Sequence, residues 1–218
     1  MPVKRFSRLP KHIGIIPDGN RRWAVAHGLS KEAGYMAGVP PAFQLYDECI
    51  KLGIKEVSAY GFTKDNTHRL AVQRKAFQGA AIEAVKILSS MDAELLVIGN
   101  SSSRLFPKEL LPYTKRTVFG KGGLKVNLLA NYDWEWDLEQ VRRPSRKTAL
   151  IDRIGSHEAS RIDLVIRWGG RRRLSGFLPV QAVYADFYIV DALWPDFEMQ
   201  HFYDALEWYD SQDVTLGG

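Results

Sequence analysis

The chain has 218 residues, of which 45% are hydrophobic and 25% are charged. This composition excludes a disordered chain, and we expect a single domain over residues 1–218 with a sizeable core. The 30 Lys and Arg residues outnumber the 25 Asp and Glu residues, and the net charge of +5 permits an anionic ligand without requiring nucleic acid. The single cysteine, Cys49, excludes an internal disulfide and argues against a cysteine-based metal cluster.

Short apolar runs alternate with longer segments of helical periodicity along the chain. The apolar runs predict strands at 13–16, 57–62, 95–98, 124–130, 164–167 and 187–190. The periodic segments predict helices at 39–52, 71–91, 108–118 and 197–211. Strands that alternate with helices form crossover units, so we expect an α/β fold with a mostly parallel central sheet flanked by helices.

Membrane insertion and secretion are not expected. No apolar run approaches the ~20 residues that a membrane-spanning helix needs. The basic segment 1–11 is not followed by the apolar stretch of a secretion signal. We therefore expect a cytoplasmic protein without stable membrane insertion. The basic segment 142–147 contains a proline and is interpreted as a surface loop.

Polar and basic segments directly follow four of the predicted strands, at 17–23, 63–69, 131–135 and 168–175. Because ligands of open parallel sheets bind beyond the carboxyl ends of the strands, we expect these segments to converge there. Arginine binds phosphate oxygens bidentately, and glycine lets backbone amides approach an anion. The combination predicts a binding site for a diphosphate.

Asp18 is unusual in such a site, because a carboxylate repels phosphate unless a cation lies between them. Mg²⁺ is a cation of this kind, since it is held by one or two carboxylates together with phosphate oxygens and water. The sequence therefore predicts Mg²⁺ as the cofactor. Asp18 is its first candidate carboxylate and Asp186 a possible second.

Each of these features also has a simpler interpretation. Asp18-Gly19-Asn20 by itself is more often a plain turn, and the basic run 171–173 by itself is more often a solvated surface. The tryptophans are more often core residues, and the five histidines lack the spacing of metal ligands. The joint placement of polar segments after several strands is what favours the diphosphate site.

Two longer motifs carry a resemblance to a known family. Residues 12–24 have the sequence HIGIIPDGNRRWA, and residues 163–175 have the sequence DLVIRWGGRRRLS, followed by AD at 185–186 and LWPDF at 193–197. In these motifs the chain resembles the cis-prenyltransferase (undecaprenyl diphosphate synthase-like) family, and the resemblance extends over 12–211. It implies allylic prenyl diphosphates as substrates, a homodimer, and a hydrophobic tunnel for the prenyl chain.

The resemblance also implies a role for each matching residue. Asp18 would hold Mg²⁺ and help the allylic diphosphate leave, and Asp186 stands in the place of the family's metal-binding glutamate. Thr63 and Asn66 match the family's Ser-x-x-Asn pair near the reacting carbons. The residues implied in binding the allylic diphosphate are Gly19, Asn20, Arg21, Arg22 and Lys31. Those implied in binding the second diphosphate are Arg69, Arg167, Arg173 and Ser175, with Arg171 in the same site.

The implied reaction is a carbocation-like alkylation. The allylic C–O bond breaks, the alkene of the second substrate attacks, and a proton is lost. The protein would stabilise the departing diphosphate and position two apolar tails. No histidine or unpaired acid stands out as the base, and the diphosphate itself could take the proton.

Several positions depart from the family's usual pattern. The replacements are Pro17 for Met, Tyr35 for a phosphate-contacting His, Thr67 for Trp, residues 133–135 for Gly-Gly-Arg, and Arg171 for Glu. We expect these departures to cluster around the second substrate. The pattern resembles the irregular branch of the family, the lavandulyl- and isosesquilavandulyl-type diphosphate synthases. That branch couples two allylic diphosphates head-to-middle, with dimethylallyl diphosphate as acceptor and dimethylallyl or geranyl diphosphate as donor.

Other functions stay open at this stage. A regular head-to-tail synthase that uses isopentenyl diphosphate would share the motifs, and bulky Phe77 suits a short tunnel in either case. A catalytically silent partner subunit is disfavoured, because it has no need of Asp18. A nucleic-acid-binding module is disfavoured because the arginines lie at strand ends beside acids and form no continuous stripe.

Overall fold

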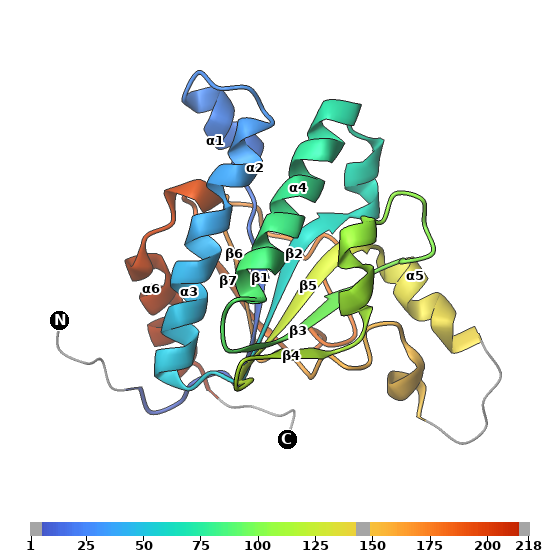
Figure 1. The fold of residues 1–218 in the computed structure, drawn as a ribbon. Helices are drawn as coiled ribbons and strands as arrows, with labels where there is room; N and C mark the ends of the chain where they lie inside the picture. Colours follow the sequence, from blue (N-terminus) through green and yellow to red (C-terminus); the bar gives the residue numbers. More distant parts are fainter. Residues whose placement is uncertain (1–5, 143–148, 214–218) are drawn as a thin grey trace.

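The computed structural model describes residues 6–142 and 149–213, and within them seven strands form one central sheet (Figure 1). The strands are β1 (His12–Ile16), β2 (Glu56–Thr63), β3 (Ala93–Ile98), β4 (Thr117–Phe119), β5 (Leu124–Tyr132), β6 (Leu164–Arg167) and β7 (Asp186–Ile189). Their order across the sheet is β4-β3-β5-β2-β1-β6-β7. Every neighbouring pair is parallel except β3 and β4. The expected α/β fold with a mostly parallel sheet is confirmed.

Helices cover one face of the sheet and its carboxyl edge. The α-helices are α1 (Asn20–Ala26), α2 (Ala33–Ala37), α3 (Val39–Leu52), α4 (Ala71–Leu88), α5 (Trp134–Glu139) and α6 (Met199–Asp210). Short 3₁₀ helices are η1 (Lys64–His68), η2 (Lys108–Thr114), η3 (Gln140–Arg142), η4 (Leu150–Arg153) and η5 (Trp194–Asp196). In Figure 1, α3, α4 and α6 lie against one face, and α1 and α2 lie beyond the carboxyl ends of the strands. Among the described residues, no helix has the length and apolar character to cross a membrane.

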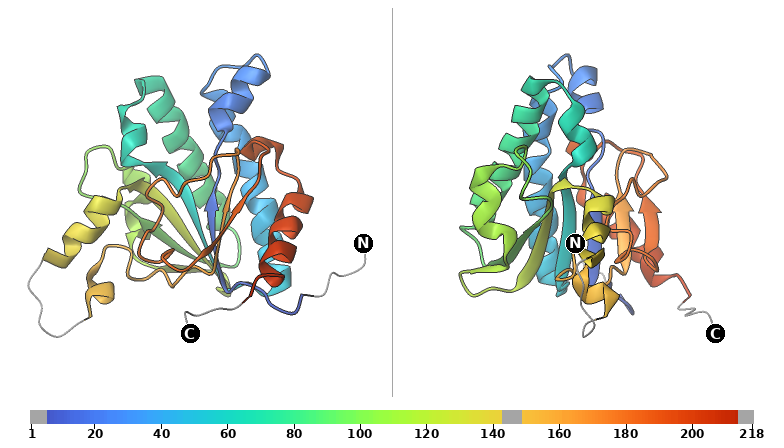
Figure 2. Two further views of the ribbon diagram at one scale, coloured as in Figure 1. Left: turned by 180° about the vertical axis from the view of Figure 1, so that it is seen from behind. Right: turned by 90° about the vertical axis from the view of Figure 1, so that its right-hand side faces the viewer.

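The sheet separates two hydrophobic clusters. Because side chains alternate along a strand, β6 sends Leu164 and Ile166 into the cluster under the helices and Val165 into the other. The second cluster lies beneath α5 and the irregular chain between η4 and β7, which cover the opposite face in Figure 2. Both faces of the sheet are therefore buried, which explains the continuous apolar runs of its strands.

The predicted helix at 108–118 is wrong. The segment forms the 3₁₀ helix η2, which contains Pro112, followed by the edge strand β4. Proline has no amide hydrogen and breaks an α-helix in its interior. The released chain then pairs antiparallel with β3, where Phe119 lies opposite Ala93. The predicted loop at 142–147 lies outside the described residues apart from Arg142.

The short helices α1, α2 and η1 were also not predicted, and they matter most for the site. Each belongs to a polar stretch of chain that follows β1 or β2. Since β2, β1 and β6 are neighbours in the sheet, the segments after them meet at one edge. Ile16 and Arg167 are paired in the register, and this places the ends of β1 and β6 side by side.

Candidate active site

A cavity of about 790 Å³ opens at the carboxyl ends of β1, β2 and β6. Its wall combines residues from four separate stretches of the chain. The predicted site residues that line it are Asp18, Gly19, Asn20, Arg21, Arg22, Lys31, Thr63, Asn66, Arg69, Arg167, Arg173 and Ser175. The structure therefore brings both predicted sets of diphosphate ligands to one cavity.

Asp18 is held between two arginines. Its Oδ2 accepts a hydrogen bond of 2.7 Å from Nη2 of Arg167, and its Oδ1 lies 3.4 Å from Nη2 of Arg22. Arg167 is almost fully buried, whereas one third of the Asp18 side chain is exposed. The carboxylate is thus fixed in direction while one side of it stays open to the cavity.

Arg167, the last residue of β6, also fixes the loop that follows it. Its Nη1 donates to the hydroxyl of Ser175 at 2.9 Å and to the backbone carbonyl of Arg173. Ser175 itself has a left-handed backbone with φ of 51°. The guanidinium of Arg167 therefore folds the loop back over the cavity, so that Arg173 and Ser175 face it.

Two buried polar atoms at this site have no hydrogen-bond partner in the described part of the chain: Nε of Arg167 and Oδ1 of Asn20. Buried polar groups are normally paired, so an unpaired one needs an explanation. Both residues line the cavity. A ligand with its own hydrogen-bonding groups would satisfy such atoms.

Gly169 allows Arg22 to approach the backbone. Nη2 of Arg22 donates to the Gly169 carbonyl at 2.9 Å, which ties α1 to the loop after β6. Gly169 has φ of +85°, and a Cβ there would lie against Nη2 of Arg22 and 2.9 Å from the Asp18 carbonyl oxygen. A side chain at this position would disrupt both contacts.

The opposite wall is built by η1. Thr63 and Asn66 hold each other, because the Thr63 hydroxyl accepts from the Asn66 amide and Oδ1 of Asn66 accepts from the Thr63 amide, each at 3.3 Å. Arg69 follows directly, and its Nη1 donates to the Tyr35 hydroxyl at 2.8 Å. The reciprocal cap and the arginine bond set the position of this wall relative to α2.

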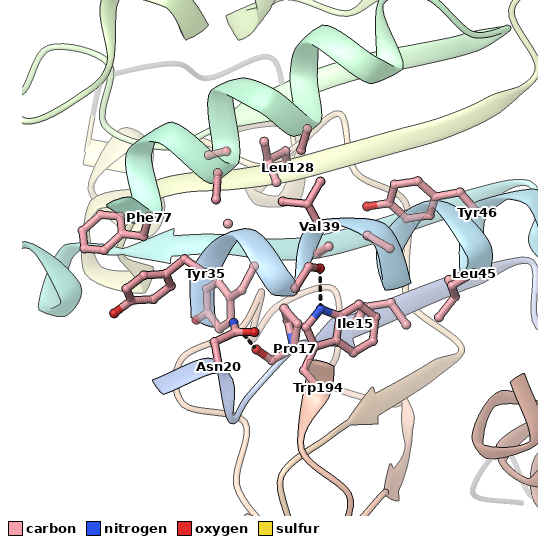
Figure 3. Close-up of a pocket in the computed structure, with 18 of the residues that line it drawn as sticks. Ile15, Pro17, Asn20, Tyr35, Val39, Leu45, Tyr46, Phe77, Leu128 and Trp194 are labelled. Atoms are coloured by element: carbon pink, nitrogen blue, oxygen red, sulfur yellow. Dashed lines mark hydrogen bonds between the residues drawn. The ribbon is translucent and has the colours of Figure 1, made fainter. Parts of the chain in front are cut away.

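A second, apolar cavity of about 90 Å³ continues from the first between α3, α4 and the sheet (Figure 3). The two cavities share Pro17, Asn20, Tyr35, Tyr60 and Gly61 in their walls. The remaining lining is largely aliphatic and aromatic and includes Phe77, Leu128 and Trp194. A polar chamber that opens into an apolar one suits an amphiphilic ligand with an anionic head.

Asp186 and Arg171 lie outside this arrangement. Asp186 begins β7 opposite Leu164, at the other end of β6 from Arg167, and its Oδ2 is 3.9 Å from Nη2 of Arg8. Within one chain it does not meet Asp18, contrary to the expectation of a shared metal site. Arg171 is exposed and is not part of the cavity wall.

The cavity wall also contains Asp65 and Tyr60, to which the sequence analysis assigned no role, and Tyr35, which it expected near the second substrate as the replacement for a phosphate-contacting His. Asp65 follows β2 just as Asn66 does, so its position after a strand was the available signal. Tyr60 lies within β2, where only the pairing of the strands places it at the site. Burial raises the pKa of Tyr60, and its hydroxyl donates to the Ser175 carbonyl at 2.9 Å.

Two departures from the family pattern, at position 67 and at positions 133–135, do not lie where we expected the second substrate. Asp133 caps α5 and forms an ion pair of 2.7 Å with Lys64. With Thr67 and Glu135, these residues line a separate cavity of about 310 Å³ beside η1. Position 67 in η1 and positions 133–135 at the start of α5 therefore do not line the 790 Å³ cavity.

The fit to a metal ion depends on the substrate. Asp18 and Asp65 are the carboxylates in the cavity wall among the described residues. Within that same part of the chain, no group of three or more His, Cys, Asp or Glu side chains could hold a metal ion. A single carboxylate fits Mg²⁺ when phosphate oxygens and water supply the other ligands. The residues at the cavity fit Mg²⁺ in that form.

Comparison with known proteins identifies the family. A family model described as a putative undecaprenyl diphosphate synthase matches residues 16–217. The chain belongs to this family.

A relative of this prenyltransferase, the ditrans,polycis-undecaprenyl-diphosphate synthase of Escherichia coli (strain K12), is 34% identical over 229 aligned residues, covering 95% of this chain and 90% of the relative. The corresponding synthase of Aliivibrio fischeri is 33% identical and covers 96% of this chain and 89% of its own. Both are described as specific for (2E,6E)-farnesyl diphosphate.

A solved structure supports the fold of this prenyltransferase. Lavandulyl diphosphate synthase from Lavandula x intermedia, in complex with dimethylallyl diphosphate, superposes with a TM-score of 0.83. The two chains are 24% identical, and the match covers 96% of this chain and 98% of the other. The similarity shows a common fold. The substrates of the plant enzyme are not assigned to this chain by that similarity.

Proposed function

We propose that this prenyltransferase makes a short-chain prenyl diphosphate by irregular head-to-middle coupling of two allylic diphosphates. Dimethylallyl diphosphate is the acceptor, and dimethylallyl or geranyl diphosphate is the donor. A polar cavity of about 790 Å³ that opens into an apolar cavity of only about 90 Å³ carries the short-chain part of the proposal. Pro17 and Tyr35, in the wall that the two cavities share, carry the irregular coupling. Ligand pockets commonly measure roughly 300–1,000 Å³, so the polar chamber has room for two diphosphates while the apolar one suits a short tail.

Two groups of side chains support two diphosphate positions. Asn20, Arg21, Arg22 and Lys31 extend from the start of α1 to the turn before α2. The second group comes from the segment after β2, the last residue of β6 and the loop that follows it, and its members are Arg69, Arg167, Arg173 and Ser175. Arginine binds phosphate oxygens through charge-assisted, bidentate hydrogen bonds. We assign the first group to the donor and the second to the acceptor.

Asp18 stands beside both groups and is the residue that would hold Mg²⁺. When bound, the ion neutralises charge that develops on the leaving diphosphate. The arginines of the first group stabilise the same charge and keep the diphosphate oriented as the allylic C–O bond breaks. The alkene of the acceptor then attacks the allylic carbon, and the proton lost from the product passes to the released diphosphate.

The apolar cavity holds the donor tail. Phe77 reduces its width from the α4 side, and its ring centroid lies 4.8 Å from that of Phe62. A tail much longer than a geranyl group would require these rings to move. The eleven prenyl units implied by the name of the Escherichia coli relative do not match a cavity of this volume.

A regular head-to-tail synthase is the second candidate, and the curated relatives favour it. It would place isopentenyl diphosphate at the second group of arginines and use the same cavity. Pro17 and Tyr35, which differ from the usual family residues, line the shared wall of the two cavities and support the irregular reaction.

We further propose a homodimer. Val183 and Tyr184 are exposed by 65% and 72%, and they lie in the turn that leads to the edge strand β7. Exposed apolar side chains beside an open sheet edge are features that a second chain can cover. Asp186 lies next to this surface, away from the cavity of its own chain.

The test is a comparison of substrate pairs. Purified protein with Mg²⁺ is given labelled dimethylallyl diphosphate alone, with geranyl diphosphate, or with isopentenyl diphosphate, and the products are identified after dephosphorylation. We expect branched products from the two allylic mixtures. Product formed only with isopentenyl diphosphate would establish the regular reaction. Absence of product from every pair would favour a silent partner subunit.

A further inference from the structure

We propose that Tyr35 is a specificity-determining residue that restricts the donor to a short tail and links that restriction to the binding of the second diphosphate. The inference rests on the proposed function and adds a residue to it. Tyr35 is the point where three features meet: the polar cavity, the apolar cavity and the side chain of Arg69.

The hydroxyl of Tyr35 is committed to Arg69. Nη1 of Arg69 donates to it at 2.8 Å, across the space between α2 and the segment after η1. Arg74 holds the same segment by its main chain, since Nη1 of Arg74 donates to the Arg69 carbonyl at 2.8 Å. Arg69 is thus supported on both its main chain and its side chain, and Tyr35 supplies the side-chain support.

The ring of Tyr35 lies at the junction of the two cavities. It contacts Phe77 edge to face, with 5.8 Å between the ring centroids. Figure 3 shows Tyr35 and Phe77 together at one end of the apolar cavity, with Leu45 and Tyr46 toward the other. Only 9% of Tyr35 is exposed, so neighbouring residues enclose the ring.

The hydrogen bond to Arg69 and the ring contact with Phe77 both hold Tyr35 in place. A tail that needs more room at this end of the apolar cavity pushes the ring of Tyr35 aside, and that movement breaks the hydrogen bond to Arg69. In the proposed function the Tyr35 bond orients Arg69 toward the second diphosphate, so loss of the bond weakens binding of that diphosphate. Because such coupling is reciprocal, displacement of the ring costs more when the second diphosphate is bound. Tyr35 therefore discriminates against long tails most strongly when both substrates are bound.

The experiment measures tail-length preference by binding, so that it does not depend on turnover. Calorimetry with the thiolodiphosphate analogues of dimethylallyl, geranyl and farnesyl alcohols gives three dissociation constants, with and without inorganic pyrophosphate. For the native chain we expect the short analogues to bind more tightly than the farnesyl analogue. Y35A should shift the ratio of dimethylallyl to farnesyl affinity by at least about tenfold toward farnesyl, the scale of discrimination expected for apolar pockets.

The matched controls are two tyrosine-to-phenylalanine variants. Y35F keeps the ring but releases Arg69, and it should shift the ratio in the same direction by less and remove its dependence on pyrophosphate. Y113F removes a hydroxyl in η2, outside the walls of both cavities, and should leave the ratio unchanged. Thermal unfolding shows whether each variant is folded.

The outcomes separate this inference from the proposed function. An unchanged ratio in Y35F and Y35A, or equal effects of Y35F and Y113F, would overturn the role of Tyr35. So would a native chain that binds the farnesyl analogue as tightly as the dimethylallyl analogue. Failure of the native chain to couple any substrate pair, with the expected ratios intact, would count against the proposed reaction alone.

Discussion

Asp18 is surrounded by positively charged side chains. Arg167 and Arg22 contact its two oxygens, and Arg21 and Lys31 line the same cavity. Positive charge at this density suits anions, and a single carboxylate within it suits a cation that binds together with them. Asp65 shares the cavity but is exposed, so the two carboxylates can be compared directly.

Replacement of Asp18 by Asn should remove catalysis. D18N keeps the size of the side chain but loses the charge that would bind Mg²⁺, and we expect kcat to fall by at least about 100-fold, as for loss of one group that stabilises a transition state. D65N changes the exposed carboxylate, and its kcat should fall by less than about tenfold. Initial rates at saturating Mg²⁺ provide the measurement, with thermal unfolding as the check of folding. Near-native activity of D18N would remove Asp18 from the proposed mechanism.

At the scale of secondary structure, η1 decides the shape of the site. Three kinds of contact hold it. They are the Thr63–Asn66 cap, the hydrogen bonds from Arg74 to the backbone carbonyls of Thr67 and Arg69, and the ion pair between Lys64 and Asp133. The side of η1 that carries Asn66 faces the 790 Å³ cavity, and Thr67 faces the neighbouring cavity of about 310 Å³. A 3₁₀ helix of five residues has few internal hydrogen bonds, so these external contacts determine its orientation.

Two substitutions of Thr63 distinguish the effect of its hydroxyl from the effect of its branched shape on the cap of η1. T63V removes the hydroxyl that accepts from the Asn66 amide, whereas T63S keeps it. Loss of such a cap costs about 0.5–2 kcal/mol, and we expect T63V to unfold more easily by this amount and to turn over more slowly. T63S should resemble the native chain in both respects. Urea unfolding and kcat are the measurements, and equal behaviour of the two variants would contradict a role for the hydroxyl.

At the scale of the whole molecule, a buried polar network crosses the amino ends of the strands. Nε2 of His12 in β1 lies 2.8 Å from the Ser58 hydroxyl in β2, and Nδ2 of Asn127 in β5 donates to Ser58 at 2.9 Å and to Glu56 at 2.6 Å. Nδ1 of His12 lies 3.0 Å from the Ser160 carbonyl. The network joins three adjacent strands and the chain that leads to β6, at the opposite end of the sheet from the cavity.

Burial lowers the pKa of His12, although Glu56 and Asp163 oppose the shift. A histidine whose folded pKa lies below its unfolded value of about 6.5 binds protons more readily when unfolded. Its contribution to stability is therefore complete above about pH 6.5 and is lost as the pH falls through the folded pKa. We expect the free energy of unfolding to decrease below pH 6.5, with a slope approaching about 1.4 kcal/mol per pH unit. Urea unfolding from pH 7 to 5 tests this, and H12Q should show a flatter profile.

Much of the fold was predictable because most of its strands can be identified from the local sequence alone. A strand buried on both faces is a continuous apolar run, and such runs identified β1, β2, β3, β5 and β6. The error at 108–118 came from the edge strand β4, which is short, half exposed and paired only through β3. Its formation depends on a neighbour distant in the sequence, so the local pattern does not reveal it.

For the site, the sequence by itself determined the family, the sheet and the set of basic and acidic residues that follow β1, β2 and β6. Tertiary structure decided which of them meet. Asp186 stands at the expected position of the family motif. Strand register nevertheless places it opposite Leu164, at the far end of the sheet from Asp18. Tyr35, Tyr60 and Asp65 enter the cavity wall because α2, β2 and η1 are oriented by contacts between distant segments. Residue type and spacing are properties of the chain alone, whereas the direction of a side chain depends on the elements that pack around it.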